Sequence, residues 1–375
     1  MQEKRGSRLL KHIDRYVGVL ILLLLALLLK AKRLFSPSRP SDSDPILLVC
    51  FGAIGDLIVL TTAARKVLAG RKVYLACSKL NFPCARLFED FYAGISVVDI
   101  RNPFSVFSIC QQYSVFQIID STQWANIGPI QTGIANLLSS NGNSVGFKTE
   151  SAIRNSVYDL AVDHSANIHE VANFMNLIAG CPLVRSNSEL ADLLPNLYQL
   201  KPSVRSGKVL LHLWPSGNRS YLKAWPEAYW QELARYLVGA GYSVYLSGAP
   251  SDHSRTSDFI ERSGLPLMNL AGSLDLKSLL QFCKEELEFA VSVNTGILHL
   301  LVEAGVPVIG LHGGVNPQCW GPLGANAISL LPQSGKSAYL HYGFEYPKSD
   351  EEAYSLDKLT IEQVIESIES LRAKG

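Results

Sequence analysis

The sequence has few cysteines, and their arrangement excludes a disulfide or zinc framework. Seven cysteines are scattered over 375 residues, and most of them lie within apolar segments. An odd number of cysteines without a repeated short spacing is typical of reduced thiols in a hydrophobic core. This usage indicates a reducing compartment, so we expect the folded body to lie in the cytoplasm.

The signatures of several common enzyme classes are also absent. No P-loop, kinase or zinc pattern occurs, and no G-x-G-x-x-G follows a strand, which excludes a nicotinamide-dependent oxidoreductase. Asp163-His164 and His169-Glu170 do not have the spacing of a common metal site. Asp42-Ser43-Asp44 lies in a Pro/Ser-rich stretch that is typical of a solvated spacer. We therefore expect no metal ion and no bound cofactor.

Charge is nearly balanced over the whole chain but not along it. The net charge is +1, yet residues 1–40 hold nine Lys/Arg against Glu3 and Asp14, which leaves 25 basic and 31 acidic residues in the remainder. Aromatic residues of the body do not alternate with a basic stripe, so nucleic acid is excluded as a partner. A basic arm on a mildly acidic body points instead to an anionic membrane surface.

No apolar run has the usual length of a membrane span. Residues 16–29 (YVGVLILLLLALLL) are uncharged and bounded by Arg15 and Lys30, whereas a spanning helix needs about 20 apolar residues. Both flanks are basic, which gives no bias toward one orientation across a bilayer. No small-residue cleavage site follows, so a cleaved signal peptide is not expected. We interpret residues 1–35 as a monotopic or re-entrant membrane anchor whose flanks bind anionic lipids, with a single span as the alternative. A helix buried in a soluble fold is disfavoured, because the run is apolar on every face.

The rest of the chain alternates short apolar strands with helical stretches. A linker, 36–45 (SPSRPSDSDP), precedes a first series over 46–195, and a second series covers 208–350. This alternation predicts two α/β domains with parallel sheets and a cleft between them where ligands meet the carboxyl ends of the strands. Residues 356–375 predict an amphipathic C-terminal helix that can cross back to the first domain.

The segment FGAIGDLIVL, 51–60, leads from the first strand into a helix through a glycine turn. The turn resembles a phosphate-binding loop, but Asp56 stands at the mouth of the helix, where it would repel a phosphate. Taken alone, Asp56 is best interpreted as a helix cap or an acid of the first turn.

The segment FAVSVNTGILHL, 289–300, has the features of a diphosphate site. A buried strand ends at Asn294, and Thr295-Gly296 lead directly into a helix that carries His299. The first amides of a helix lack intrahelical partners and attract anions, and Asn294 can cap that helix. On this segment alone, an ordinary capped helix of an α/β protein is the preferred interpretation.

The segment LHLWPSGNRSYLKAWPE, 211–227, adds positive charge to the same half of the chain. A strand runs into a turn containing Ser216 and Gly217, and a polar loop then carries Arg219 and Lys223. The ammonium group of Lys223, just before Trp225-Pro226 opens a helix, can reach a diphosphate leaving group.

These motifs together resemble glycosyltransferase family 9, the lipopolysaccharide heptosyltransferase family. The resemblance rests on the G-x-x-G-D turn, WPSGNRSYLKAWPEAYW, YLSGAPSD, NLAGSLDLKSLL and NTGILHLLVEAGVPVIGLHGGVNPQCWGPLG, in that order, and covers about 45 to 325. It implies a GT-B fold, in which two Rossmann-like domains flank a cleft and the second binds a nucleotide-diphospho-sugar, here ADP-heptose-like.

The resemblance also implies chemistry and place. The family inverts the anomeric carbon without a metal ion, and Asp56 matches its proposed general base. Ser216, Gly217, Arg219, Lys223, Asn294, Thr295, Gly296 and His299 would bind the donor. The acceptor would be a lipid-linked or lipopolysaccharide glycan at the cytoplasmic face of the inner membrane, close to the backbone at Gly52 and Gly55. Independently of the resemblance, we expect Trp124 and Arg154, and also Tyr74 and Tyr158, to line the acceptor side.

One position departs from the family pattern. The family motif D-T-G reads Asn294-Thr295-Gly296 here. Asparagine caps a helix as well as aspartate does, so the backbone site is expected to persist, but any role that needs a carboxylate is lost. A catalytically inert sugar-nucleotide-binding or scaffold protein of envelope assembly is therefore the alternative hypothesis.

Overall fold

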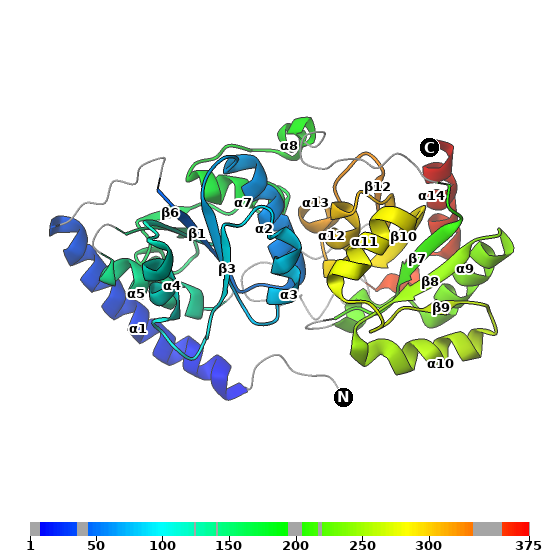
Figure 1. The fold of residues 1–375 in the computed structure, drawn as a ribbon, viewed down its shortest axis with the longest axis horizontal. Helices are drawn as coiled ribbons and strands as arrows, with labels where there is room; N and C mark the ends of the chain where they lie inside the picture. The colour runs from blue at the N-terminus through cyan, green and yellow to red at the C-terminus, as the bar shows by residue number, and fades with distance from the viewer. Residues whose placement is uncertain are drawn as a thin grey trace. The chain divides into compact units, whose positions relative to one another are not determined.

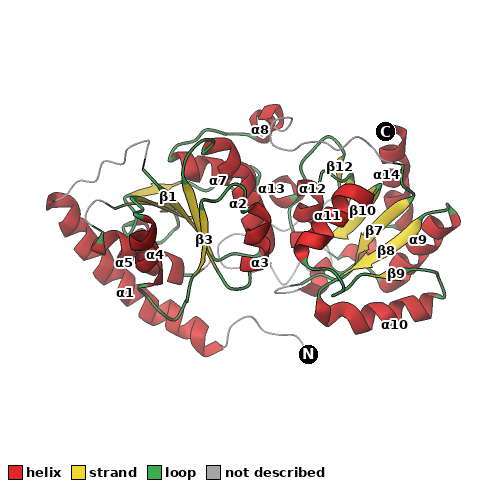
Figure 2. Ribbon diagram, viewed as in Figure 1, coloured by secondary structure: helices red, strands yellow, loops and turns green. Residues whose placement is uncertain are grey.

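The structure is a computed structural model that describes residues 8–35, 44–123, 125–139, 142–193, 205–216, 220–332 and 355–374. The chain divides into two compact units, Met1–Asn187 and Ser188–Gly375 (Figure 1). Each unit contains one six-stranded sheet in which all pairings are parallel. Figure 2 shows the helices that pack around each sheet.

The strands of the first unit are short and apolar, as expected for a parallel sheet that is covered on both faces. They are β1 (Ile46–Cys50), β2 (Val73–Cys77), β3 (Gly94–Val97), β4 (Gln117–Asp120), β5 (Asn143–Phe147) and β6 (Leu160–Val162). The helices are α1 (Arg8–Phe35), α2 (Ile54–Val67), α3 (Phe82–Ala85), the 3₁₀ helix η1 (Arg86–Phe88), α4 (Ser105–Tyr113), α5 (Ile127–Leu138), α6 (Ala152–Asn155) and α7 (Glu170–Ala179), with α8 (Asn187–Leu193) at the boundary of the units.

The strand order of the first sheet is β3-β2-β1-β4-β5-β6. The chain builds outward from β1 through β2 to β3, then returns to place β4 on the other side of β1, where Val49 pairs with both Ala76 and Asp120. Helices α2 and α7 pack on each other, as do α4 and α5, while α1 packs against α5. This is the doubly wound order, in which the connections that follow β1 and β4 leave in opposite directions and form a crevice outside the carboxyl ends of these paired strands.

The second unit repeats this architecture with different residues. Its strands are β7 (Lys208–His212), β8 (Ser243–Ser247), β9 (Met268–Asn269), β10 (Phe289–Val293), β11 (Val308–Leu311) and β12 (Ala327–Leu330), in the order β12-β11-β10-β7-β8-β9. Its helices are η3 (Ser220–Lys223), α9 (Glu227–Gly239), η4 (Pro250–Asp252), α10 (His253–Ser263), α11 (Leu276–Glu286), α12 (Gly296–Glu303), α13 (Pro317–Trp320), η6 (Leu356–Lys358) and α14 (Ile361–Lys374). The strand order therefore reverses between β7 and β10, as it does between β1 and β4.

The C-terminal helix belongs to the core of the second unit. Val364 and Ile368 of α14 are fully buried in the cluster that contains Trp230 and Leu237 of α9. The indole N–H of Trp225 donates to the carbonyl of Leu359 at 2.8 Å. The expectation that this helix crosses back to the first domain is therefore wrong, because its apolar face is used within its own unit.

Helix α1 packs one face against the first unit (Figure 1). Leu22, Leu25 and Leu29, which recur at helical spacing, are buried against Ile130 of α5 and Val157. The apolar pattern disfavours a helix packed into the fold, and for this face that expectation is wrong, because α5 supplies an apolar partner that the sequence pattern does not reveal. Among the residues that the structure describes, no helix is both long and apolar enough to cross a membrane.

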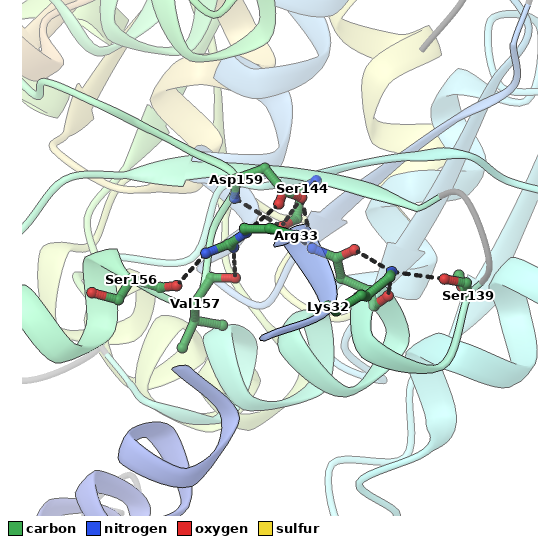
Figure 3. A network of polar contacts seen from close by, with 8 residues as sticks. Lys32, Arg33, Ser139, Ser144, Ser156, Val157 and Asp159 are labelled. Carbon is green, nitrogen blue, oxygen red and sulfur yellow. Dashed lines mark hydrogen bonds and ion pairs between the residues drawn. The ribbon is translucent and has the colours of Figure 1, made fainter. Parts of the chain in front are cut away.

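Two basic residues at the end of α1 also bind the protein (Figure 3). The Lys32 ammonium donates to the carbonyl of Asn136 and, at 2.7 Å, to the carbonyl of Ser139. The Arg33 guanidinium donates to Asp159 at 2.6 Å and to the carbonyls of Ser156 and Val157. The expectation that these flanking charges bind lipid headgroups is therefore wrong for Lys32 and Arg33.

The buried His212 of β7 gives the second unit a pH-dependent stability. Its Nδ1 lies 2.9 Å from the Ser247 hydroxyl, and burial lowers the pKa of His212 to about 4. The unfolded chain binds a proton near the ordinary pKa of about 6.5, so the unfolded state holds more protons between these values and stability falls as pH falls.

We expect protonation linked to His212 to lower the free energy of unfolding of the wild-type protein by about 2 kcal/mol between pH 7.5 and pH 5. Denaturant unfolding of wild type and His212→Gln at both pH values measures it, and the variant should show the smaller pH dependence. His253→Gln is the matched control, because His253 is exposed in the same unit. An equal pH dependence in wild type and His212→Gln would contradict the assignment.

Candidate functional site

A pocket lies in the first unit at the carboxyl ends of β1 and β4. Residues that follow β1 form one wall, and residues between β4 and α5 form the other. This is the place where open parallel sheets bind ligands, because the loops leave in opposite directions there. The lining residues are Cys50, Phe51, Gly52, Asp56, Ser121, Thr122, Gln123, Ala125 and Ile127.

Asp56 lines this pocket and also caps its own helix. One carboxylate oxygen accepts the N–H of Ala53 at 2.7 Å, the return bond of a capping box. The side chain folds back over Gly52, where a Cβ would lie 2.7 Å from the Asp56 Cγ, so only glycine fits. The cap holds the carboxylate in one orientation at the pocket wall. Gly55 is buried in the first turn of α2 and is not among the lining residues.

The second unit contains the same kind of helix cap, made by Asp252. Gly248-Ala249 precedes η4, and Asp252 accepts the N–H of Ala249 at 2.8 Å. A Cβ on Gly248 would likewise lie 2.9 Å from the Asp252 Cβ. Asp252 is further paired with Arg255. The G-A-x-x-D cap thus occurs twice among the described residues, so the cap by itself does not mark a catalytic residue.

A buried carboxylate, Asp120, holds the opposite wall. One of its oxygens accepts both the N–H and the hydroxyl of Thr122, and the other accepts the hydroxyl of Tyr158 at 2.8 Å and that of Thr132 at 3.3 Å. Burial raises the pKa of Asp120, and the bonds from Thr122 and Tyr158 oppose this shift. Two of these bonds tie the loop residue Thr122 to the end of β4, and the other two come from α5 and from the segment after α6, so the loop that begins at Ser121 is fixed in shape.

The expected acceptor-side residues have different fates. Arg154 is buried and donates to the carbonyl of Thr122 at 2.8 Å, so it supports the wall from behind. Tyr158 lies beside it on Asp120, whereas Tyr74 stacks on Tyr113 in the hydrophobic core, with ring centroids 4.0 Å apart. Trp124 lies outside the described residues.

A second buried polar group adjoins Gln123 of the pocket. The Gln123 amide donates to Glu170 at 3.3 Å, and His164 Nε2 lies 2.7 Å from the other oxygen of that carboxylate. His169 caps α7 by accepting the N–H of Val171. Within the described ranges, no group of three His, Cys, Asp or Glu side chains is placed to hold a metal ion.

Four of the residues expected to bind the donor follow β7 and β10, the two neighbouring strands of the second sheet between which the strand order reverses. Ser216 follows β7 and is exposed, and Asn294, Thr295 and Gly296 follow β10. Thr295 is the N-cap of α12, since its hydroxyl accepts the N–H of Ile297 at 3.3 Å. The helix start therefore lies at the second point of strand reversal, with its dipole positive toward the crevice.

Asn294 does not cap the helix, contrary to expectation. Its side-chain amide donates to Nδ1 of His312 at 2.8 Å and to the carbonyl of Trp320 at 3.3 Å. A carbonyl oxygen can only accept, so the amide nitrogen must face both partners, and the neutral His312 carries its proton on Nε2. A carboxylate at this position could accept a hydrogen bond from the other tautomer of His312, but it could not donate one to the Trp320 carbonyl, so asparagine fits both partners.

The remaining donor-side residues are spread along the same unit. His299 is buried in α12, and its ring meets that of Trp320 edge-on with centroids 6.0 Å apart. Lys223 ends η3 and is half-buried, and Trp225, two residues later, is anchored in the core and on Leu359. The tail segment thus helps to hold the loop that carries Lys223. Gly217 and Arg219 lie outside the described residues.

Sequence reasoning missed the wall after β4. None of Asp120, Ser121, Thr122 and Gln123 is among the site residues predicted from the sequence. The signal was a buried strand that ends in Asp-Ser-Thr, which is a polar end at the carboxyl edge of a parallel sheet.

We expect Asn294→Asp to destabilise the second unit at pH 8. The carboxylate would face the Trp320 carbonyl without a hydrogen to donate, and an unsatisfied buried polar group costs about 1–3 kcal/mol. Lowering the pH to 5 should reduce the loss, because a protonated His312 can pair with the carboxylate. Thermal unfolding at the two pH values tests this, and equal stability of the variant and wild type at pH 8 would contradict the assigned bonds.

Comparison with known proteins places this geometry in context. The sequence profile of glycosyltransferase family 9 (heptosyltransferase) matches residues 135–348, which is more than half of the chain. Lipopolysaccharide heptosyltransferase 1 of Pseudomonas aeruginosa is 33% identical over 127 residues, 32% of this chain and 33% of that protein. Lipooligosaccharide heptosyltransferase 2 of Haemophilus influenzae is 24% identical over 183 residues, 47% of this chain and 51% of that protein. The matches thus span a third to a half of these relatives.

The solved structures show the fold. The ADP-heptose lps heptosyltransferase II of E. coli superposes with a TM-score of 0.67 at 15% identity, covering 88% of this chain and 99% of that one. The expected α/β GT-B-like class, with two parallel six-stranded sheets, is confirmed. The cleft between the domains stays a prediction.

Proposed function

Because this chain belongs to glycosyltransferase family 9 (heptosyltransferase), we propose that it transfers a heptose-like sugar from a nucleotide-diphospho-sugar to a lipid-linked or lipopolysaccharide glycan, at the cytoplasmic face of the inner membrane. The proposed donor is ADP-heptose-like, in keeping with the ADP-heptose named for the E. coli relative. We further propose that transfer inverts the anomeric carbon and needs no metal ion or cofactor.

The observation that supports this proposal best is the placement of Asp56. Its carboxylate is held by the Ala53 N–H at the wall of a pocket that opens at the strand reversal. There it would accept the proton of an acceptor hydroxyl while that oxygen attacks the anomeric carbon. The bond to the sugar forms as the bond to the diphosphate breaks, so the leaving group departs with the electron pair.

The second unit would bind the donor and take up the charge of the leaving diphosphate. The amides that begin α12 and the ammonium of Lys223 are suited to this, because both favour an anion. Lys223 is carried by a loop that Trp225 anchors, so its position depends on the packing of the tail segment.

Asp56→Asn is the sharpest test of the catalytic role. Asparagine keeps the shape of the side chain and an oxygen for the Ala53 N–H, but it cannot accept the proton. We expect transfer to fall by about 10²–10⁴-fold, while the rise in melting temperature on adding ADP is retained. Transfer from ADP-heptose to a heptose-deficient lipopolysaccharide acceptor is the measurement.

Asp252→Asn is the matched control, because Asp252 makes the same cap in the second unit. It should leave transfer within a few-fold of wild type. Unchanged transfer by Asp56→Asn would refute the assigned role. Binding of ADP-heptose by wild type with no transfer to the acceptor would instead favour the alternative of an inert sugar-nucleotide-binding protein.

Lys223→Gln tests the donor side separately. Removing a cation from a diphosphate site should weaken ADP binding by about tenfold, since one charged hydrogen bond contributes about 1.5–3 kcal/mol. Lys277→Gln, which changes another lysine of the same unit on α11, serves as the control. Isothermal titration with ADP measures both, and equal affinities of Lys223→Gln and wild type would remove Lys223 from the site.

A further inference from the structure

The outward face of α1 is apolar, although the opposite face packs on the unit. Leu20, Leu24 and Leu27 are 68%, 59% and 61% exposed, and they recur at the three- and four-residue spacing of one helix face. A contiguous exposed apolar patch on a folded protein marks a site that binds a membrane or another protein. Of the described basic side chains on α1, Lys32 and Arg33 are bonded to the unit, so they do not interrupt this face.

We propose that this outward face docks the protein on the surface of a bilayer that contains anionic lipid. Helix α1 would lie in the plane of the interface, with its leucines in the acyl region and the unit above it. Protein–protein interfaces are enriched in aromatic residues, methionine and arginine, whereas most of this face consists of aliphatic side chains. Tyr16 at the start of the apolar run and Phe35 at the end of α1 are 63% and 84% exposed, and aromatic residues are typical of helices at a membrane interface.

Charge on α1 favours an anionic surface. Besides Lys32 and Arg33, which bind the protein, the helix contains four Lys/Arg, including the exposed Lys30, against one acid, Asp14. An amphipathic helix of this kind binds through buried apolar area together with attraction to anionic headgroups.

The packing of α1 fixes how the membrane would meet the unit. Leu22, Leu25 and Leu29 hold successive turns against the unit, and the bonds of Arg33 hold the carboxyl end. A helix bound along its length in this way cannot turn upright without breaking those contacts. The bilayer would therefore meet α1 along its side.

The same packing brings α1 beside the pocket of Asp56. A Cβ on Gly18 would lie 3.2 Å from the Asn126 amide nitrogen, so the helix backbone closely approaches the start of α5. Asn126 stands between Ala125 and Ile127, which line the pocket. A bilayer on the outward face would then lie about one helix diameter, ~10 Å, from this wall. If the proposed function holds, a lipid-borne acceptor would reach Asp56 without leaving the membrane.

Vesicle flotation of the full chain tests the docking surface independently of catalysis. We compare wild type with Leu20→Gln/Leu24→Gln/Leu27→Gln, in which glutamine keeps helix propensity but removes the apolar face. We expect wild type to float with phosphatidylglycerol-rich vesicles, and the triple variant to partition at least roughly tenfold more weakly. Binding of wild type should weaken in phosphatidylcholine vesicles and at high salt.

The matched control replaces three exposed apolar residues outside α1, Leu80→Gln/Ile100→Gln/Leu183→Gln. These residues are 71%, 56% and 51% exposed, so the control loses similar side chains from other surfaces of the unit. It should float as wild type does. Melting temperatures of all three proteins should agree, which shows that any loss of flotation is not unfolding.

Three results would overturn the proposal. They are no flotation of wild type, equal flotation of wild type and the triple variant, and equal binding to neutral and anionic vesicles. A wild-type dimer that the triple variant converts to a monomer, without vesicle binding, would assign the face to a second copy of the chain. Transfer to a delipidated, water-soluble acceptor should be unchanged in the triple variant, which separates failure of docking from failure of the proposed chemistry.

Discussion

The reversal of strand order between β1 and β4, and again between β7 and β10, is the constraint on which the sites of this protein depend. In a parallel sheet every strand ends at the same edge, so neighbouring loops usually leave together and close over that edge. Only where the order reverses do they separate and leave a crevice. Asp56 stands at one reversal and Thr295 at the other. Two equivalent crevices on two equivalent sheets can thus divide one reaction between an acceptor and a donor.

The two capping carboxylates, Asp56 after β1 and Asp252 after β8, show that one local structure can stand in different surroundings. Asp56 and Asp252 make the same bond to a backbone N–H after the same glycine-alanine turn. The carboxylate of Asp252 also forms an ion pair with Arg255, and the carboxylate of Asp56 borders a pocket. A cap that fixes a carboxylate lowers the reorganisation needed when a proton arrives, since the side chain is already oriented. Capping and catalysis are therefore compatible roles for one residue.

Helix α1 adds an outer layer to this arrangement. Its inward face packs on α5 and excludes solvent there. Its outward apolar face remains exposed, because no other element among the described residues covers it. The helix also closely approaches the residue between two lining positions of the Asp56 pocket, Ala125 and Ile127. One element thus joins the surface on which the unit would rest to the wall against which an acceptor would bind.

The sequence by itself determined the strand–helix alternation and the family, because hydrophobic periodicity and ordered motifs are local properties of the chain. Partners brought together from distant segments were decided only by the tertiary structure. The bond of Asn294 to His312, the wall built on Asp120, and the burial of one face of α1 each depend on a neighbour that no local pattern identifies. An apolar run is equally apolar on all sides in sequence, and only packing against α5 decides which side faces the protein.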